Sequence, residues 1–317
     1  MNRDSLRGPL LRSVSRSFYL SLRFLPKTLR DPLSLAYLLA RATDTIADTP
    51  DPPVALRTEG LRDLAAAIQG TANREIMETL KSFARLQSDE AERTLIEQLP
   101  ALLDWLDELP ADDRAEVRSV LVKINRGQSL DLQRFGAADK IRALKNAAEL
   151  DEYTYLVAGC VGEFWTRLCF AHVKNFSAQP ESEMRDLGIR YGQGLQLINI
   201  LRDAGNDLRD GRCYFPVDEL DSLGLKASEI LSDPDRIEPV LKKWREKAEH
   251  GIEAGMEYAA AIRSRRVRFA TALPAKIGKR TLALLREAGA NALTRRIKVP
   301  RGEIRKMILS SALGRST

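Results

Sequence analysis

The stretch QLINILRDAGNDLRDGR, residues 196–212, decides the fold of this chain. Its polar side chains Gln196, Asn199, Asp203 and Asp207 fall at offsets of 0, 3, 7 and 11, which return to one side of an α-helix. Leucine and isoleucine fill most of the other positions before Asp203, as is typical of a buried helix. Unpaired polar groups are costly to bury, so this stripe must face partners, water or a cavity.

The two aspartates of this stripe indicate a bound cation. Like charges four residues apart destabilise a helix by about 0.2–0.5 kcal/mol in water, and by more once they are desolvated. The neighbouring ligand atoms are oxygens, a set that suits a hard cation such as Mg2+, held by one or two carboxylates and by substrate phosphates. A solvated, charged helix face is the alternative explanation of one such pair taken alone.

The same arrangement occurs a second time, in residues 37–48. Tyr37, Arg41, Asp44 and Asp48 fall at offsets of 0, 4, 7 and 11, among small and apolar residues. Two such helices facing each other would place four carboxylates at one cavity mouth, and a diphosphate of about −3 would bring the charge to about −7. About two or three divalent cations would offset that charge. The repetition therefore favours metal-assisted binding of a diphosphate.

Composition predicts an all-α, single-domain protein. Of 317 residues, 44% are hydrophobic and 30% are charged, the balance of an ordinary soluble domain. Helix-forming Leu, Ala, Arg and Glu dominate, and no linker divides the chain, so we expect one domain over residues 1–317. Residues 49–53 contain three prolines, which should end the helix that carries the second stripe.

The location indicated by the sequence is cytoplasmic. No 18-residue apolar run and no signal-peptide pattern occur. Three cysteines without metal-binding spacing fit a reducing compartment. Two histidines are too few to favour zinc chemistry or a His-based triad.

The last part of the chain is strongly basic. Between Arg263 and Lys306 there are 14 Lys or Arg and two acids, a charge of +12, so the rest carries 6 − 12 = −6. Such a segment could bind nucleic acid, anionic lipid or a phosphorylated small molecule. No recognisable nucleic-acid-binding module accompanies it, so no nucleic acid is expected as a partner. We expect the enzyme to be soluble or peripheral on an anionic membrane.

Two further stretches carry candidate site residues. Ala158, Gly159 and Gly162 leave one part of an otherwise bulky apolar helix without large side chains. The space would admit either a hydrocarbon ligand or a closely crossing helix. Tyr153, one turn before Val157, is either a hydrogen-bonded core tyrosine or a polar group aimed into an apolar tunnel. Two arginines are candidates for binding phosphate oxygens, because guanidinium groups suit them. Arg16 lies between two serines, and a turn at Gly211 could bring Arg212 back beside the aspartates.

These motifs resemble those of the squalene/phytoene synthase family, the head-to-head prenyl transferases. The resemblance covers nearly the whole chain and is closer to squalene than to phytoene synthases. It is carried by four stretches: SRSFYL at 15–20, Tyr37 to the DTIAD motif at 44–48, YTYLVAGCVG at 153–162, and QLINILRDAGNDLRDGRCYFP at 196–216.

The resemblance implies the all-α isoprenoid synthase fold, with helices around a central cavity, and a set of site residues. Mg2+ would be held by Asp44, Asp48, Asn199, Asp203 and Asp207. Tyr153 would face the carbocations and help to remove a proton. NADPH phosphates would be contacted by Lys298 and Arg301. Substrate binding would fall to Arg16, Phe18, Tyr37, Arg41, Val157, Gln196, Arg202, Arg212 and, more weakly, Tyr258.

The implied reaction joins two farnesyl diphosphates to presqualene diphosphate, which is then reduced by NADPH to squalene. Two departures bear on it: Ala47 stands where squalene synthases often carry another acid, and Pro300 stands where the second basic residue usually falls. The alternatives are a non-reductive synthase, making presqualene diphosphate, dehydrosqualene or phytoene, and a non-catalytic, membrane-associated assembly factor of the same fold. Four retained aspartates disfavour the assembly factor. Prenyl chain length and oligomeric state are left open by the sequence.

Overall fold

Helices carry almost all of the regular structure, as the sequence predicted. The computed structural model describes residues 3–15, 22, 25–50, 52–136 and 140–312. Contacts group the chain into two compact units: unit 1 comprises residues 1–133 and 167–174, and unit 2 comprises residues 134–166 and 175–317. The single domain over residues 1–317 stays a prediction.

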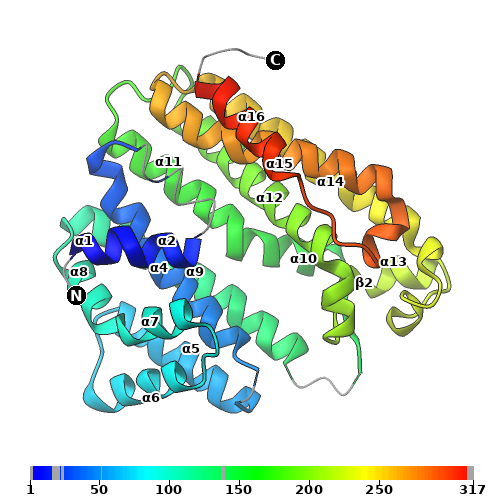
Figure 1. Cartoon of the computed structure of the whole chain (residues 1–317), viewed down its shortest axis with the longest axis horizontal. Coiled ribbons are helices and arrows are strands. Elements are labelled where there is room, and N and C mark those ends of the chain that lie inside the picture. The colour runs from blue at the N-terminus through cyan, green and yellow to red at the C-terminus, as the bar shows by residue number, and fades with distance from the viewer. Residues whose placement is uncertain (1–2, 16–21, 23–24, 51, 137–139, 313–317) are drawn as a thin grey trace. The chain divides into compact units, whose positions relative to one another are not determined.

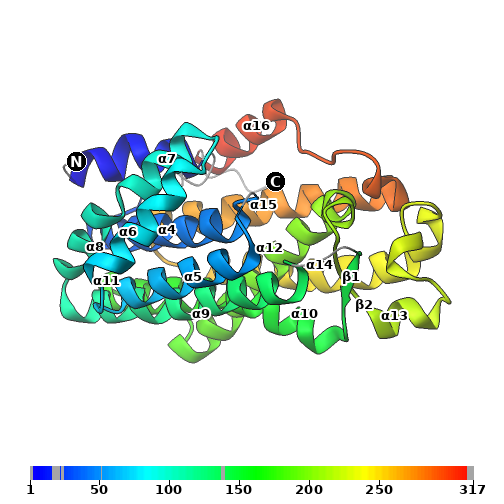
Figure 2. The same ribbon diagram turned by 90° about the horizontal axis from the view of Figure 1, so that it is seen from below.

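Unit 1 is built from helices of the N-terminal part of the chain, coloured blue to green in Figure 1. Asn73 and Asp89 cap two of them by accepting hydrogen bonds from backbone N–H groups of the first turn. Within it, α4, α5 and α8 pack against one another (Figure 2). Its elements are α1 (Arg3–Ser5), the π-helical η1 (Leu6–Leu10), α2 (Leu11–Ser15), α4 (Lys27–Asp48), α5 (Val54–Ile68), α6 (Arg74–Arg85), α7 (Glu90–Glu97), α8 (Leu99–Asp107) and most of α9 (Ala111–Phe135).

Unit 2 is organised around α12, which spans 29 residues and packs along α14. Helix α15 lies against both, and α16 lies on α15 (Figure 1). Its elements are β1 (Arg142–Leu144), α10 (Ala147–Thr154), the π-helical η2 (Tyr155–Gly159), α11 (Cys160–His172, ending in unit 1), α12 (Glu181–Arg209), β2 (Arg212–Pro216), α13 (Val217–Ser222), η3 (Ala227–Glu229), η4 (Pro234–Ile237), α14 (Glu238–Ala261), α15 (Arg265–Ala288), η5 (Gly289–Leu293) and α16 (Arg301–Ala312).

Small residues let the helices of unit 2 approach closely. A Cβ atom added to Gly162 would lie 1.9 Å from the carbonyl oxygen of Gly188, and one added to Gly192 would lie 2.3 Å from that of Ala158. Both contacts join the segment of residues 158–162 to α12. Of the two explanations that the sequence left open for these small residues, the tight helix crossing is therefore the one that the structure shows.

Replacing Gly162 by Ala should lower the free energy of unfolding by about 3 kcal/mol, because the new methyl group would collide with backbone that cannot move aside cheaply. Gly302→Ala is the matched control, since nothing lies within 4 Å of a Cβ at that position. Chemical denaturation of the two variants measures the difference. Equal stabilities would contradict the close crossing.

A two-stranded parallel sheet, which the sequence did not predict, joins two distant stretches of unit 2. Arg142 pairs with Arg212, and Ala143 pairs with Cys213. Gly211, at φ +82°, ends the preceding helix and admits the turn into β2. Strand pairing thereby fixes the backbone of Arg212 directly after α12.

The three cysteines are buried and free of disulfides. Burial raises the pKa of the Cys169 thiol far above its usual range and raises that of Cys213 to about 12. Cys169 belongs to unit 1, whereas Cys160 and Cys213 belong to unit 2. No helix in the described part of the chain has the length and apolarity needed to cross a bilayer.

Candidate active site

Helix α4 presents the polar stripe predicted from its sequence. Between residues 32 and 49 every side chain is buried apart from five, which lie on one side of the helix. The five are Tyr37, Ala40, Arg41, Asp44 and Asp48. Packing of the remaining Leu, Ala and Thr residues into unit 1 therefore sets the direction in which both aspartates point.

The end of α4 is held firmly beside Asp48. The helix stops at Thr49, in extended conformation, before Pro50, as predicted. Arg57 donates a hydrogen bond to the carbonyl oxygen of Ala47 (3.1 Å), and buried Gln87 donates one to the Thr49 hydroxyl (2.8 Å). The first bond satisfies a carbonyl group that a helix end leaves open, and both hold the last turn of the helix in place.

Asp44 is a strongly perturbed carboxyl group of this stripe. Burial, followed by the charge of Asp48, raises its pKa to about 7, against the opposing effects of Arg41 and of a hydrogen bond from Gln128. Gln128 Nε2 donates that bond to Asp44 Oδ1 at 2.5 Å. A carboxylate that is costly to ionise beside another acid is a place where a cation would be stabilised.

This shift has a consequence for stability. The folded-state pKa of about 7 lies above the ordinary 3.8, so the native state holds an extra proton between about pH 4 and 7. The stability that neutral Asp44 contributes is present below that window and is lost as the pH rises through 7. We compare the free energy of unfolding of Asp44→Asn with that of wild type, both in EDTA. The variant's advantage should be about 1–2 kcal/mol larger at pH 8 than at pH 5, allowing for solvent screening. Urea denaturation at both pH values tests this, with exposed Asp104→Asn as the control; equal shifts would contradict it.

Two partners of the α4 stripe were missed by sequence analysis. Arg41 is paired with Glu92 of α7, and Gln128 of α9 reaches Asp44. Both belong to helices read as amphipathic scaffold, in which many similar polar residues occur. Neither carries a sequence signal that would single it out.

Helix α12 presents the second stripe on its less buried side. Asn199 is exposed, and Gln196, Asp203 and Asp207 are half-buried. Asn199 Nδ2 donates to Gln196 Oε1 (3.4 Å) within the stripe. Arg202 donates two hydrogen bonds to the Asp203 carboxylate, of 2.9 and 2.5 Å. A predicted substrate-binding arginine is therefore paired with a predicted metal ligand.

Arg212 turns back to the acids, as the sequence suggested. Its guanidinium lies 3.6 Å from Asp207 and 3.7 Å from Asp210. The turn at Gly211 and the pairing of β2 produce this approach. Arg212 thus stands beside two acids at the C-terminal end of α12.

Tyr153 is a core residue stacked on another tyrosine. Its ring centroid lies 5.1 Å from that of Tyr214, and the Tyr214 hydroxyl donates to the Tyr153 hydroxyl (3.5 Å). The π-helical turn η2 follows directly and carries half-buried Val157. Single π-helical turns are frequent at functional sites. Tyr153 is thus buried and hydrogen-bonded, and its role toward carbocations stays a prediction.

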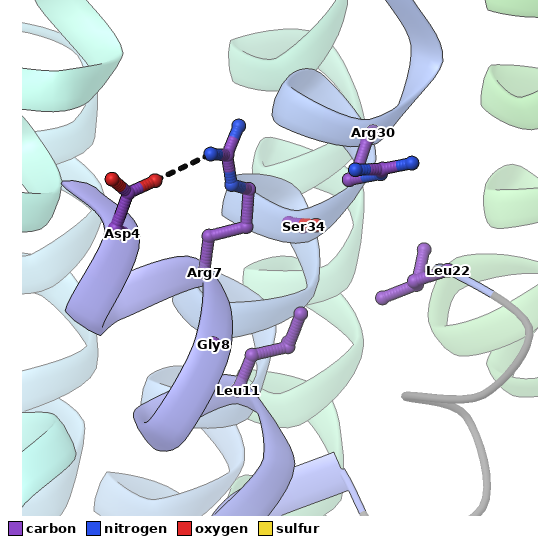
Figure 3. A pocket seen from close by; sticks show the side chains of 7 residues that line it. All are labelled: Asp4, Arg7, Gly8, Leu11, Leu22, Arg30 and Ser34. Atoms are coloured by element: carbon purple, nitrogen blue, oxygen red, sulfur yellow. Dashed lines mark hydrogen bonds and ion pairs between the residues drawn. The ribbon is translucent and has the colours of Figure 1, made fainter. Parts of the chain in front are cut away.

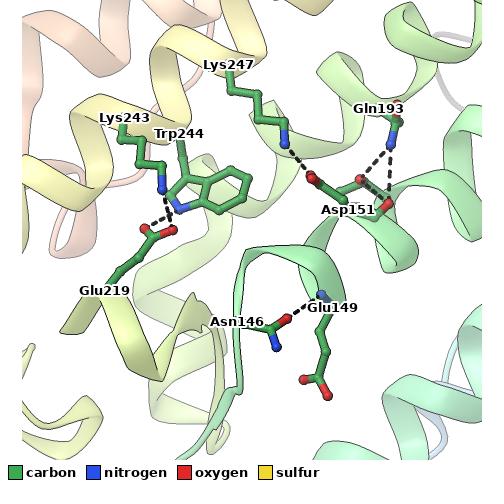
Figure 4. A network of polar contacts seen from close by, with 9 residues as sticks. Asn146, Glu149, Asp151, Gln193, Glu219, Lys243, Trp244 and Lys247 are labelled. Carbon is green, nitrogen blue, oxygen red and sulfur yellow. Dashed lines mark hydrogen bonds and ion pairs between the residues drawn. The ribbon is translucent and has the colours of Figure 1, made fainter. Parts of the chain in front are cut away.

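A polar network holds the helix that carries Tyr153 (Figure 4). Asp151 is paired with Lys247 of α14, and its backbone carbonyl accepts a hydrogen bond from Gln193 of α12 (3.2 Å). The Lys247 ammonium also lies 5.0 Å from the ring centroid of Trp244, whose indole N–H donates to Glu219 (2.9 Å). These contacts tie α10 to the two central helices of unit 2.

The remaining predicted residues have different outcomes. Tyr258 lies in the core: it is 1% exposed and its hydroxyl is bonded to Thr166 (2.8 Å). Its role as a weak diphosphate ligand stays a prediction. Lys298 and Arg301 are exposed. Arg16 and Phe18 lie outside the described residues.

The two acid pairs fit Mg2+ as partial sites. Each offers two carboxylates with further oxygen donors nearby, and no thiolate or imidazole. Within the described residues no third acid, His or Cys completes a group of three around either pair. Because Mg2+ commonly takes only one or two carboxylates and completes its shell with water and phosphate, two per pair suffice. The pairs belong to different units, so their meeting across one cavity stays a prediction.

Comparison with known proteins identifies the family. The family model of squalene/phytoene synthases matches residues 11–303. The 15-cis-phytoene synthase of Synechocystis is 27% identical over 90% of this chain and 77% of its own length. A squalene synthase of Gibberella zeae is 27% identical over 94% of this chain and 62% of its own length. The bifunctional lycopene cyclase/phytoene synthase of Phaeosphaeria nodorum is 28% identical over 75% of this chain, which spans only 38% of that relative.

Solved structures show the same fold. The squalene synthase TcSQS in complex with a ligand matches with a TM-score of 0.78 at 22% identity, over 98% of this chain and 86% of its own. A dehydrosqualene synthase matches with a TM-score of 0.65 at 21% identity, over 97% of this chain and 94% of its own. The fold is thus the all-α isoprenoid synthase fold. The chain belongs to the squalene/phytoene synthase family, prenyltransferases that join two prenyl diphosphates head to head.

Proposed function

We propose that the chain is a squalene synthase, which joins two farnesyl diphosphates to presqualene diphosphate and then reduces this to squalene with NADPH. The observation that supports it most is the repeated acid pair. Asp44 and Asp48 on α4, and Asp203 and Asp207 on α12, occupy the polar side of helices that are otherwise buried. This chemistry requires acids that can bind metal–diphosphate.

The residues of the two stripes would act mainly on the leaving group. Mg2+, when bound, would neutralise charge on the diphosphate oxygens as the allylic C–O bond breaks. Asp44, Asp48, Asn199, Asp203 and Asp207 would hold and orient it. Arg41 and Arg212, now paired with acids, would exchange those partners for diphosphate oxygens, for which guanidinium geometry is suited.

The carbon skeleton needs different surroundings. An allylic cation is captured by water unless apolar walls exclude it. Val157 on η2 and the Tyr153–Tyr214 stack provide apolar and aromatic surface beside α12. Tyr153 would steer the cation, and its hydroxyl would assist removal of the proton in the first half-reaction.

The reductive step would depend on the segment after η5. Lys298 and Arg301 are exposed cations, the second of them at the start of α16. They would contact the phosphates of NADPH, which supplies hydride to the final cation. Pro300 between them changes their spacing relative to squalene synthases, which keeps the non-reductive synthase as the second candidate.

Product analysis separates these candidates. Purified protein is incubated with farnesyl diphosphate and Mg2+, with and without NADPH, and the products are identified by mass spectrometry. Squalene that forms only with NADPH is expected. Presqualene diphosphate or dehydrosqualene in both reactions would replace the proposal by the non-reductive synthase, and a parallel reaction with geranylgeranyl diphosphate tests for phytoene.

The hydrocarbon product must reach a membrane, and the basic C-terminal segment is suited to bring the enzyme there. On α15 and the stretch after η5, Arg265, Arg266, Arg268, Arg295 and Arg296 are exposed. Anionic lipid attracts such residues by about 1 kcal/mol each near the surface. Flotation with anionic liposomes should show binding that weakens with salt, and binding that is insensitive to salt would contradict this role.

A further inference from the structure

We propose that a pocket on the N-terminal helices of unit 1 binds a compact oxyanion of the phosphate class, separately from the acid stripes. The pocket has a volume of about 170 Å3 (Figure 3). Its lining residues are Asp4, Arg7, Gly8, Leu11, Leu22, Arg30 and Ser34. Ser34 precedes Asp44 by ten residues, which is roughly 15 Å along a helix axis. The pocket is thus distinct from the α4 stripe.

Ser34 supplies the first observation that points to a ligand. Its side chain is 0% exposed, and its hydroxyl has no hydrogen-bond partner in the described structure. A buried hydroxyl without a hydrogen-bond partner is energetically unfavourable. Serine in a helix commonly bonds to the carbonyl four residues back, as Ser15 does to Leu11. A ligand atom placed next to Ser34 would give this hydroxyl the partner that it lacks.

Two guanidinium groups and the carboxylate of Asp4 line the pocket. Arg7 is held by Asp31 (2.9 Å) and Asp4 (2.5 Å), which fix its position at the pocket, and Figure 3 shows the second of these pairs. Arg30 is oriented by a hydrogen bond to the carbonyl oxygen of Leu25 (2.9 Å). The described residues between 3 and 34 contain five Lys or Arg and two acids, a charge of +3, which favours an anion.

The available space limits the ligand to a small group. The pocket could hold about five waters at roughly 30 Å3 each, which is sufficient for inorganic phosphate or diphosphate. Gly8 leaves it open, because nothing lies within 4 Å of a Cβ added there. The same chemistry would recognise a free anion or the phosphate of a lipid headgroup.

Calorimetric titration in EDTA tests the site on the full chain, because removing divalent metal silences any metal-dependent binding at the acid stripes. Inorganic phosphate, inorganic diphosphate and soluble short-chain phosphatidic acid are the three probes, at constant ionic strength. We expect one anion per chain. Tighter binding of an inorganic anion identifies a dissolved ligand, and tighter binding of phosphatidic acid identifies a headgroup. Binding of none of the three overturns the proposal.

Two substitutions locate the binding. Gly8→Glu adds an acid in the open pocket and should weaken binding at least tenfold, whereas Gly302→Glu adds the same acid at an equally open glycine of unit 2 and should leave it within twofold. Ser34→Ala, which removes only the buried hydroxyl, should weaken binding about fivefold. Thermal melting confirms that each variant folds. Unchanged affinity in folded Ser34→Ala or Gly8→Glu overturns the site.

Discussion

Replacing Asp207 by Asn should lower the rate of farnesyl diphosphate turnover by roughly 10²–10³-fold, whereas Asp210→Asn should change it less than about threefold. Both carboxylates lie near Arg212, at 3.6 and 3.7 Å. Asp207 belongs to the stripe and its side chain is 17% exposed, while Asp210 follows the end of α12 and is 64% exposed. Comparing the two variants therefore distinguishes the loss of a metal–diphosphate ligand from the loss of a negative charge near Arg212.

Initial rates as a function of Mg2+ concentration provide the measurement. If Asp207 holds the metal, its Asn variant should need more Mg2+ for half-maximal rate, and Asp210→Asn should not. Equal losses in both variants would mean that the charge around Arg212, rather than a metal ligand, limits the reaction. Thermal melting of both proteins guards against a loss of fold.

Replacing Lys298 and Arg301 together by Ala should change the product rather than stop the reaction. Each charge-assisted contact to an NADPH phosphate is worth about 1.5–3 kcal/mol, so squalene formation at limiting NADPH should fall at least about hundredfold. Presqualene diphosphate should accumulate if, as proposed, these residues serve the reductive step alone. Product ratios by mass spectrometry at several NADPH concentrations measure the effect.

Arg305 and Lys306, exposed on the same helix α16, provide a matched double substitution with the same loss of charge. It should leave the product ratio unchanged. If both double variants lose squalene equally, the effect is one of general charge and the assignment of Lys298 and Arg301 is wrong. If neither does, NADPH is bound elsewhere or is not used.

Periodicity was sufficient to predict both polar stripes. The offsets that placed Asp44 with Asp48, and Asp203 with Asp207, on single helix faces depend only on helix geometry and on burial of the intervening residues. The end of α4 at Thr49 followed from the prolines after it. The all-α fold could be predicted for the same reason, since propensity and pattern agree along most of the chain.

Contacts between distant residues could not be predicted in this way. Gln128 and Glu92 look like other polar residues on amphipathic helices, and only folding brings them to Asp44 and Arg41. The three-residue strand β1 is too short to show any alternation. The hydrogen bond between the Tyr258 hydroxyl and Thr166 in the core is likewise a long-range contact that no local pattern predicts.

The buried cysteines make the two units separately observable. A thiol whose pKa is raised by burial is scarcely ionised at neutral pH, and alkylating reagents attack the thiolate. Cys169 therefore reports opening of unit 1, and Cys213 reports opening of unit 2. Peptide mass spectrometry after timed pulses of iodoacetamide in rising urea would record both labels in one experiment. If both cysteines are labelled at the same urea concentration, the two units unfold as one cooperative domain. If one cysteine is labelled at a lower urea concentration, the unit that contains it unfolds on its own.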